Sequence, residues 1–428
     1  MYERDEWPKM PDGNDYDGKD LLTLVRSGNS PFRGLWDVNV LIREVEERLS
    51  AHVMDIPGIT KGSNSYTEAG GAQGVHLKLS NQQDVVARLA RDDANMPDFD
   101  GCPVERQALE GEFEVAVYNL LRSEPNILVS RLLYYRVPVQ HVGPRLDLPQ
   151  DIAGRHLFLF ERAEGHNNVW GDLNSEQRAY LLSRAAHIRA SLFNFDLPLD
   201  FAAVWLRKRL FYPQPEELPI AVAPTREFCV ALFTSKIEAT IGNIGDMIGW
   251  EGDNLTVGPM AAAAKQSLLR LIPHIIPADS NQASLYRLVL EHGDFGIHNM
   301  SITIDANSQP LVTSLYDWEV GRIVPAILSD PLMAVWVDLV TDENAAPSYI
   351  RVPDDATSDD HVEYKTWTRQ YFEVLFDKAP EYERVIREGK DARHIWFTLR
   401  DWREEDPEEY FGNLGAWAER RMKELGVH

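Results

Sequence analysis

A short polar segment near residue 290 carries side chains whose types and spacing suit phosphoryl transfer. It reads EHGDFGIHNM over 291–300, and YDWE follows at 316–319. Phosphoryl transfer needs a metal ion between the phosphates and a group that accepts or orients the proton of the nucleophile. A carboxylate such as Asp294 can do the second task. The amide oxygen of Asn299 and the carboxylate of Asp317 are ligands that Mg²⁺ prefers.

The elements around these residues are expected to position them. An apolar run that includes Val289 and Leu290 precedes the loop. Residues 300–304 (MSITI) and 311–317 (LVTSLYD) alternate as strands do, and Asp305–Gln309 has turn composition. The two strands therefore predict a hairpin that returns Asp317 to the side of Asn299.

The two motifs resemble those of the aminoglycoside phosphotransferase and choline kinase-like family, especially its fungal branch. The family's catalytic loop reads H-G-D-x-x-x-x-N, which residues 292–294 and Asn299 match. Its metal motif is a hydrophobic residue followed by D-W or D-[FW]-E, which residues 316–319 match. The resemblance covers about residues 55–340.

The resemblance implies a role for each matched residue. Asp294 would be the catalytic base or would orient the substrate hydroxyl, and His292 would hold the loop through hydrogen bonds. Asn299 and Asp317 would bind magnesium. The implied cofactors are ATP and Mg²⁺, and the implied activity is a small-molecule kinase that moves the γ-phosphoryl group of ATP to a hydroxyl, or less often an amine, of a small metabolite.

The resemblance also implies phosphate-binding residues in the N-terminal half. A Gly-rich turn would cover the phosphates, and the candidates in KGSNSY (61–66) are Ser63, Asn64 and Ser65. A basic residue on the third strand would contact the phosphates. Arg88 in VVARL is favoured, and Lys78 on the preceding strand is the alternative.

An acidic residue on the following helix would orient that basic residue. Glu114 in GEFEVAVYNLL is favoured over Glu112. The strand HLFLFER (156–162) resembles the family's hinge, in which Phe160, Glu161 and Ala163 would border the adenine through backbone groups. A plain buried strand that ends in a turn is the alternative reading of this segment.

Hydrophobic periodicity gives the expected elements. Asp37 should cap a helix over 38–51, and another helix should span 105–123. Extended runs occupy 75–79, 84–90 and 156–162. A long helix is expected over 174–194, with Asn174 and Gln177 as a capping pair at its start. Further helices are expected over 226–249 and 260–275, with a mostly helical remainder.

The pattern predicts an α+β fold, and the resemblance implies a protein-kinase-like one with two lobes. A small antiparallel N-lobe with one helix should span 35–163. A larger, mainly helical C-lobe should span 164–428. Residues 1–34 are expected to form a loosely packed arm.

Composition narrows the classes of partner. The formal net charge is −24, which disfavours nucleic acid and anionic membranes and is compatible with a cationic small-molecule substrate. No stretch of eighteen apolar residues and no signal-peptide pattern occurs. With two distant cysteines, Cys102 and Cys229, a reduced cytoplasmic location is expected.

Tryptophans in the C-terminal half are candidates for a substrate-binding pocket. Tryptophan faces can bind a cationic amine, although each tryptophan is more often part of a core. The candidates are Trp336, Trp367, Trp396 and Trp417.

Two other functions stay open at this point. One is a kinase-shaped binding protein without turnover, which the arginine at position 88 favours. The other is an enzyme that uses ATP for nucleotidyl transfer or for activation of a carboxylate.

Overall fold

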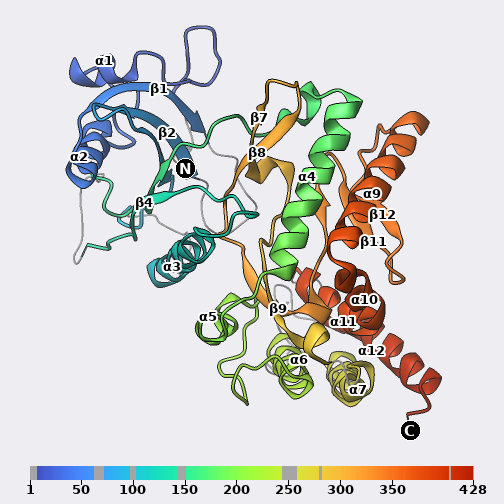
Figure 1. Cartoon of the computed structure of the whole chain (residues 1–428). Helices are drawn as coiled ribbons and strands as arrows, with labels where there is room; N and C mark the ends of the chain where they lie inside the picture. The colour runs from blue at the N-terminus through green and yellow to red at the C-terminus, as the bar shows by residue number, and fades with distance from the viewer. Residues whose placement is uncertain are drawn as a thin grey trace. The chain divides into compact units, whose positions relative to one another are not determined.

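The chain folds into two compact units. The computed structural model describes residues 7–61, 72–96, 103–141, 151–242, 258–278, 282–403 and 406–427 (Figure 1). The first unit comprises Met1–His166, Ser301–Thr303 and Thr313–Glu319, and the second comprises the rest. The division at 166/167 lies close to the expected boundary at 163/164. However, the base of the 300–315 hairpin and the YDWE motif group with the first unit rather than with the helical lobe.

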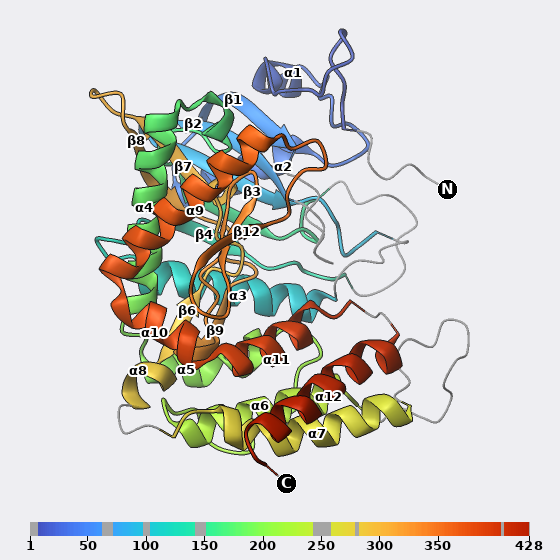
Figure 2. The same ribbon diagram turned by 90° about the vertical axis from the view of Figure 1, so that its right-hand side faces the viewer.

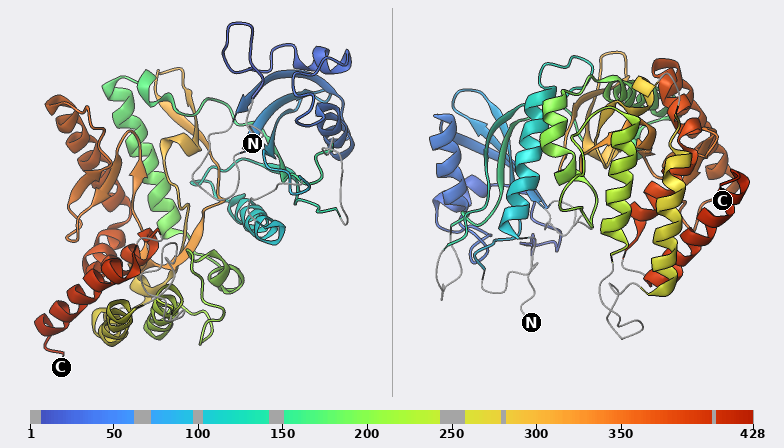
Figure 3. Two further views of the ribbon diagram at one scale, coloured as in Figure 1. Left: turned by 180° about the vertical axis from the view of Figure 1, so that it is seen from behind. Right: turned by 90° about the horizontal axis from the view of Figure 1, so that it is seen from below.

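The first unit is built on a five-stranded antiparallel sheet in the order β1-β2-β3-β5-β4. Its elements are α1 (Leu21–Arg26), α2 (Val38–Leu49), β1 (Val53–Lys61), β2 (Ala72–Leu79), β3 (Asp84–Ala90), α3 (Val104–Leu121), β4 (Leu132–Arg136) and β5 (Leu157–Glu161). Helices α1 and α2 lie on one side of this sheet and α3 on the other (Figure 3).

Alternation of side chains places one face of β3 in the core and the other toward α3. Val85, Ala87 and Leu89 are fully buried, because a strand points successive side chains to opposite faces. Arg88 lies on the other face, opposite Phe158 of β5 in the register. The predicted strands and helices are present here with shifted ends. Helix α1 and strands β1 and β4 were not predicted.

The N-terminal segment is part of the core, so the expectation of a loosely packed arm is corrected. Trp7, Tyr16 and Phe32 are buried in the same cluster as the first face of the sheet. The Trp7 indole N–H donates to the Tyr16 carbonyl at 2.9 Å, and both rings meet Phe32 edge-on. The sparse apolar residues of this segment lack a helical or strand period. They nevertheless converge in three dimensions.

The second unit is mainly helical. Its helices are α4 (Ser175–Asn194), α5 (Leu199–Trp205), α6 (Arg226–Thr240), α7 (Pro259–Ile275), α8 (Gln282–Tyr286), α9 (Ser358–Lys378), α10 (Pro380–Glu388), α11 (Lys390–Asp401) and α12 (Pro407–Glu424), with 3₁₀ turns η1 (Val169–Asp172), η2 (Arg207–Arg209), η3 (Ile297–Asn299) and η4 (Ala326–Leu328). Its strands are β6 (Leu288–Glu291), β9 (Arg322–Pro325), β10 (Met333–Ala334), β11 (Asp338–Thr341) and β12 (Pro347–Ile350). The hairpin β7 (Met300–Ile304) and β8 (Pro310–Leu315) contributes residues to both units.

Local sequence signals explain the start and the packing of the long helices. Asn174 and Gln177 form a complete capping box at the start of α4, as predicted. Helices α7 and α12 lie side by side (Figure 2). Gly415 of α12 permits this close approach, because a Cβ there would stand 2.6 Å from the Cβ of Ala264.

Helices α9 to α12 make the chain after 318 mostly helical, as expected, but the short strands β9 to β12 were not predicted. β6 pairs with β9, and β10, β11 and β12 form a separate antiparallel sheet. These strands have two to four residues each, too short for a clear period in the sequence.

The predicted α+β fold class is confirmed, with a small antiparallel sheet that has α1 and α2 on one side and α3 on the other, and a helix-rich second unit. The order β3–α3 with a basic residue on the strand and an acidic one on the helix is that of the nucleotide-binding lobe of protein kinases. No helix in the described ranges has the length and hydropathy needed to cross a bilayer.

The packed N-terminal segment leads to a test of stability. Phe32→Ala removes a fully buried ring and should lower the free energy of unfolding by about 3–5 kcal/mol. Urea denaturation measures this change, with the exposed neighbour Arg33→Ala as control. Equal midpoints for the Phe32→Ala variant and the wild type would mean that the segment does not pack on the sheet.

Candidate functional site

Arg88 is the centre of a buried ion-pair network in the first unit. Its guanidinium pairs with Glu114 of α3 through Nη2 and donates to Oδ1 of Asp317 at 3.1 Å through Nη1. It also lies over the rings of Phe158 and Phe160, at 4.6 and 5.7 Å from their centroids. Burial disfavours the charged form of Arg88, but the two carboxylates raise its pKa above its ordinary value. The side chain therefore stays a cation.

Solvent exposure separates the two favoured residues, Arg88 and Glu114, from their alternatives, Lys78 and Glu112. Glu114 is 1% exposed, whereas Glu112 points to solvent. Lys78 is also exposed. The expected Arg88–Glu114 pair is present.

Helix α3 holds the loop that carries Asp317. The Asp317 N–H donates to the hydroxyl of Tyr118 at 3.2 Å, and the Trp318 N–H donates to Oε1 of Glu114 at 3.4 Å. Glu114 and Tyr118 are four residues apart and so lie on the same helix face. Sequence reasoning missed Tyr118, and its spacing from Glu114 was the available signal.

Asp317 itself has an unusual backbone. Strand β8 ends at Leu315, two residues earlier than the predicted extended run, and Asp317 has φ 67°. A left-handed conformation is uncommon for a residue other than glycine, and such strain concentrates at functional sites. Its side chain remains 35% exposed. The turn thus directs the partly exposed carboxylate of Asp317 away from the strand. Arg88 holds its side chain and Tyr118 holds its backbone.

The surroundings of Asp317 carry more negative than positive charge. Burial and the charge of Asp317 raise the pKa of Glu319 to about 8, and Arg88 only partly opposes this. Three carboxylates, Asp317, Glu319 and Glu114, thus share one guanidinium. A divalent cation would relieve this excess of negative charge, so the donor set fits a magnesium ion.

The carboxylates around Asp317 suit a metal ion that binds together with a nucleotide. Among the residues described, no group of three or more His, Cys, Asp or Glu side chains converges to hold a metal alone. Magnesium in nucleotide sites is usually bound by one or two carboxylates, with phosphates and water completing the shell. The second carboxylate oxygen of Asp317 is the atom available for such a role, since Arg88 donates to the first.

The predicted hinge leaves one backbone donor available. The Glu161 N–H donates to the Arg131 carbonyl and the Arg162 N–H to the Asp84 carbonyl, both at 2.9 Å. In the described part of the chain no partner is found for the N–H of Ala163. Phe160 is buried and stacks on Phe158. Ala163 is therefore the best-placed donor for an adenine edge among the predicted hinge residues.

The catalytic-loop residues come together in the second unit. Nδ2 of Asn299 donates to the Asp294 carbonyl at 2.9 Å and to its Oδ2 at 3.1 Å. Because this orients the amide, Oδ1 of Asn299 is the atom left for a cation. Nε2 of His298 also contacts Oδ2 of Asp294, at 2.9 Å.

These contacts set the ionisation of Asp294. Burial alone would raise its pKa, but the hydrogen bond and charge of His298, the charge of His292 and the amide of Asn299 lower it below the ordinary value. Asp294 is therefore ionised at neutral pH, and its side chain is 51% exposed. It can accept a proton or a hydrogen bond from an incoming hydroxyl.

The loop that carries Asp294 is held by tightly packed neighbours, and a larger residue at position 293 would clash. Gly293 has φ 84°, and a Cβ there would stand 2.0 Å from the Val320 carbonyl oxygen. His292 is fully buried and meets Phe295 edge-on. The Arg322 guanidinium donates to the Gly293 carbonyl at 3.4 Å. The expected role of His292, to hold the loop through hydrogen bonds, stays a prediction.

Glu291, immediately before the loop, anchors it to a buried polar network that the sequence did not reveal. One oxygen of Glu291 accepts from the N–H of Asp330 at 2.6 Å and lies 3.4 Å from Arg189. Asp330 in turn pairs with Arg400 at 2.6 Å. Two buried charges, Glu291 and Arg189, and two half-buried ones, Asp330 and Arg400, are thereby compensated behind this loop.

The tryptophans do not form the amine pocket that was considered. Trp336 and Trp367 surround Arg178, whose guanidinium lies 4.9 and 5.7 Å from their ring centroids. The protein's own cation thus occupies these faces. Trp396 is buried against Phe211 and Phe233, and Trp417 packs on His394.

The three predicted residues of the Gly-rich turn, Ser63, Asn64 and Ser65, lie outside the described residues. Their predicted contact with phosphate stays a prediction.

Comparison with known proteins gives similarity in structure only. No protein-family model matches the chain, and no curated protein matches its sequence. Among solved structures, the ADP-bound aminoglycoside phosphotransferase APH(2'')-Ib is 12% identical, with a TM-score of 0.41, over 89% of this chain and 99% of that chain.

Two further structures are similar at the same level. The macrolide 2'-phosphotransferase MphH from Brachybacterium faecium is 13% identical, with a TM-score of 0.38, over 91% of this chain and 97% of that chain. The amicoumacin kinase hAmiN, in complex with AMP-PNP, Ca²⁺ and Ami, is 9% identical, with a TM-score of 0.38, over 91% of this chain and 95% of that chain. At these values we transfer no residue role from them.

The crowded carboxylates predict a pH-dependent stability. Because the folded-state pKa of Glu319 is raised to about 8, its contribution to stability is present below about pH 4.5 and is lost as the pH rises through 8. Glu319→Gln should therefore stabilise the protein relative to the wild type more at pH 8.5 than at pH 5. Chemical denaturation at both values measures this, with exposed Glu112→Gln as control. A pH-independent difference would contradict the assigned crowding.

Proposed function

We propose that the chain is an ATP-dependent phosphotransferase that moves the γ-phosphoryl group to a hydroxyl, or less often an amine, of a small metabolite. The observation that carries the proposal is the network around Asp317. A buried basic residue on β3 pairs with an acidic residue on α3, and both contact the loop of a strained, partly exposed aspartate. This is the arrangement by which kinases hold phosphates and metal.

The residues have separate tasks in this proposal. In the first unit, Arg88 would hold the α- and β-phosphates, Asp317 would bind magnesium, and the Ala163 N–H would meet the adenine. In the second unit, Asn299 would offer its amide oxygen to the metal, as the catalytic-loop motif implies. Bound Mg-ATP would supply the γ-phosphoryl group and the cation that neutralises charge on it.

Asp294 would act on the acceptor. Its lowered pKa keeps it ionised, so it can align the acceptor hydroxyl and take up its proton as the new P–O bond forms and ADP leaves. His298 would keep this carboxylate in one orientation through its 2.9 Å contact. The net charge of −24 favours a cationic acceptor through long-range attraction.

The products of ATP turnover test the reaction class. We expect ³¹P NMR of the protein with Mg-ATP and a panel of small alcohols and amines to show ADP together with a phosphorylated acceptor. Accumulation of AMP would instead indicate nucleotidyl transfer or carboxylate activation. ATP that is bound but never consumed with any acceptor would favour the non-catalytic alternative.

The role of Asp294 is tested in the same assay. Asp294→Asn should reduce ADP formation by about 10²–10⁴-fold and leave nucleotide binding nearly unchanged, because the residue acts on the acceptor proton. Asp359→Asn makes the same charge change at an exposed position of α9 and should be neutral. Unaltered turnover in the Asp294→Asn variant would remove this residue from the mechanism.

A further inference from the structure

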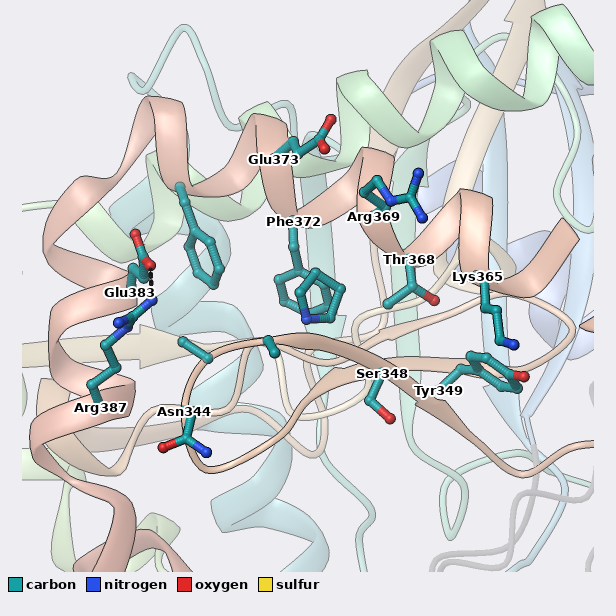
Figure 4. Close-up of a pocket in the computed structure, with 14 residues that line it drawn as sticks. Asn344, Ser348, Tyr349, Lys365, Thr368, Arg369, Phe372, Glu373, Glu383 and Arg387 are labelled. Atoms are coloured by element: carbon teal, nitrogen blue, oxygen red, sulfur yellow. Dashed lines mark hydrogen bonds and ion pairs between the residues drawn. The ribbon is translucent and has the colours of Figure 1, made fainter. Parts of the chain in front are cut away.

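A groove in the second unit has no role in the proposed reaction. It encloses about 890 Å³ between α9 and the turn that joins β11 to β12 (Figure 4). Sites for small molecules typically have volumes of about 300–1,000 Å³. No residue of the catalytic loop lines it.

The floor of the groove is apolar and aromatic. Phe372 is fully buried, Phe376 is half-buried, and their ring centroids lie 5.5 Å apart. Ala345 and Pro347 face them from the β11–β12 turn. Such a surface suits a flat or flexible hydrocarbon body.

The wall opposite α9 is held in shape by hydrogen bonds of its own. Oδ1 of Asp342 accepts from the N–H groups of Asn344 and Ala346, at 2.9 and 2.8 Å. The hydroxyl of Tyr349 lies 2.9 Å from Nδ1 of His361 on α9. The turn is therefore fixed at both ends, so a ligand need not order it on binding.

The two ends of the groove differ in charge. At one end, Lys365 lies beside Tyr349 (Figure 4), and Arg369 follows one helical turn later. Within the described ranges, neither cation has an ion-pair partner. At the other end, Arg387 is neutralised by Glu383 at 2.6 Å. Glu373 also lines the groove. It is eight residues, or about 12 Å along the helix, from Lys365, but only one helical turn from Arg369.

Unpaired cations on this surface are informative because the chain as a whole is strongly acidic. A cationic ligand would be repelled by Lys365 and Arg369, and a neutral ligand would gain no ion pair with either. An anionic group there would gain charge-assisted hydrogen bonds.

We infer that this groove binds a small amphipathic anion. Its carboxylate, or a group of like charge and size, would lie at Lys365, and the more distant Arg369 would add electrostatic attraction. Its apolar body would lie on Phe376, Ala346 and Pro347, which line the groove with exposed surface. This site is independent of the proposed phosphotransferase reaction and requires neither nucleotide nor metal.

Three naphthalene probes with one ring system test the charge selection. They are 2-naphthoate, neutral 2-naphthylmethanol and cationic 2-naphthylmethylammonium, titrated against the full chain by ligand-observed NMR. For ligands of this size we expect 2-naphthoate to bind with a Kd on the order of 1 mM. It should bind about tenfold more tightly than the neutral probe, and the cation least.

Variants locate the site. The double variant Lys365→Gln/Arg369→Gln should bind 2-naphthoate about tenfold more weakly and bind neutral 2-naphthylmethanol unchanged. Phe376→Ala should weaken both probes. Lys378→Gln, which removes a cation of the same helix outside the groove, is the matched control and should change neither.

Several results would overturn the inference. These are equal binding of the three probes, no binding of 2-naphthoate at several millimolar, or equal losses in the double variant and in Lys378→Gln. Because the readout is binding without ATP, failure here leaves the proposed function unaffected, and loss of phosphotransfer leaves the groove unaffected.

Discussion

The burial of Arg88 is the constraint on which the first unit depends. A guanidinium in an aromatic core is costly unless carboxylates compensate it, and here Glu114 and Asp317 do so from two different segments. The ion pairs join β3, α3 and the loop after β8 into one structure. The same contacts hold Asp317 in a left-handed conformation with part of its carboxylate exposed. The contacts that stabilise the first unit thus also position the carboxylate that we propose as a metal ligand.

Ion pairs between distant segments also hold the loop around Asp294 in the second unit. Glu291 is buried and Asp330 is half-buried, and their partners, Arg189 and Arg400, come from helices far apart in the sequence. This network fixes the start of the loop, and Gly293 allows the close approach to the Val320 carbonyl. Asp294 therefore projects from a rigid base, and its neighbours Asn299 and His298 determine its orientation and its ionisation.

Motifs and periodicity predicted the parts of the fold that have local causes. The capping box of α4 and the strands β2 and β3 follow from local residue patterns, whereas the choice of Glu114 over Glu112 came from the family resemblance. The burial of Trp7 and Phe32, the short strands β9–β12 and the turn at Asp317 depend on contacts between distant segments. No local pattern encodes those contacts. The tryptophans illustrate the same limit, since only the structure places Arg178 against their faces.

Thermal unfolding with millimolar Mg-ATP tests the central claim, that Asp317 is the metal ligand of a nucleotide site, most directly. A ligand at about 100 times its Kd stabilises by roughly 2.7 kcal/mol. The unfolding midpoint should therefore rise in a magnesium-dependent manner for the wild type and for the control Glu112→Ala, but not for Asp317→Ala. No rise at any nucleotide concentration, or the same rise in the Asp317→Ala variant, would contradict the claim and turn the search from acceptor substrates to binding partners.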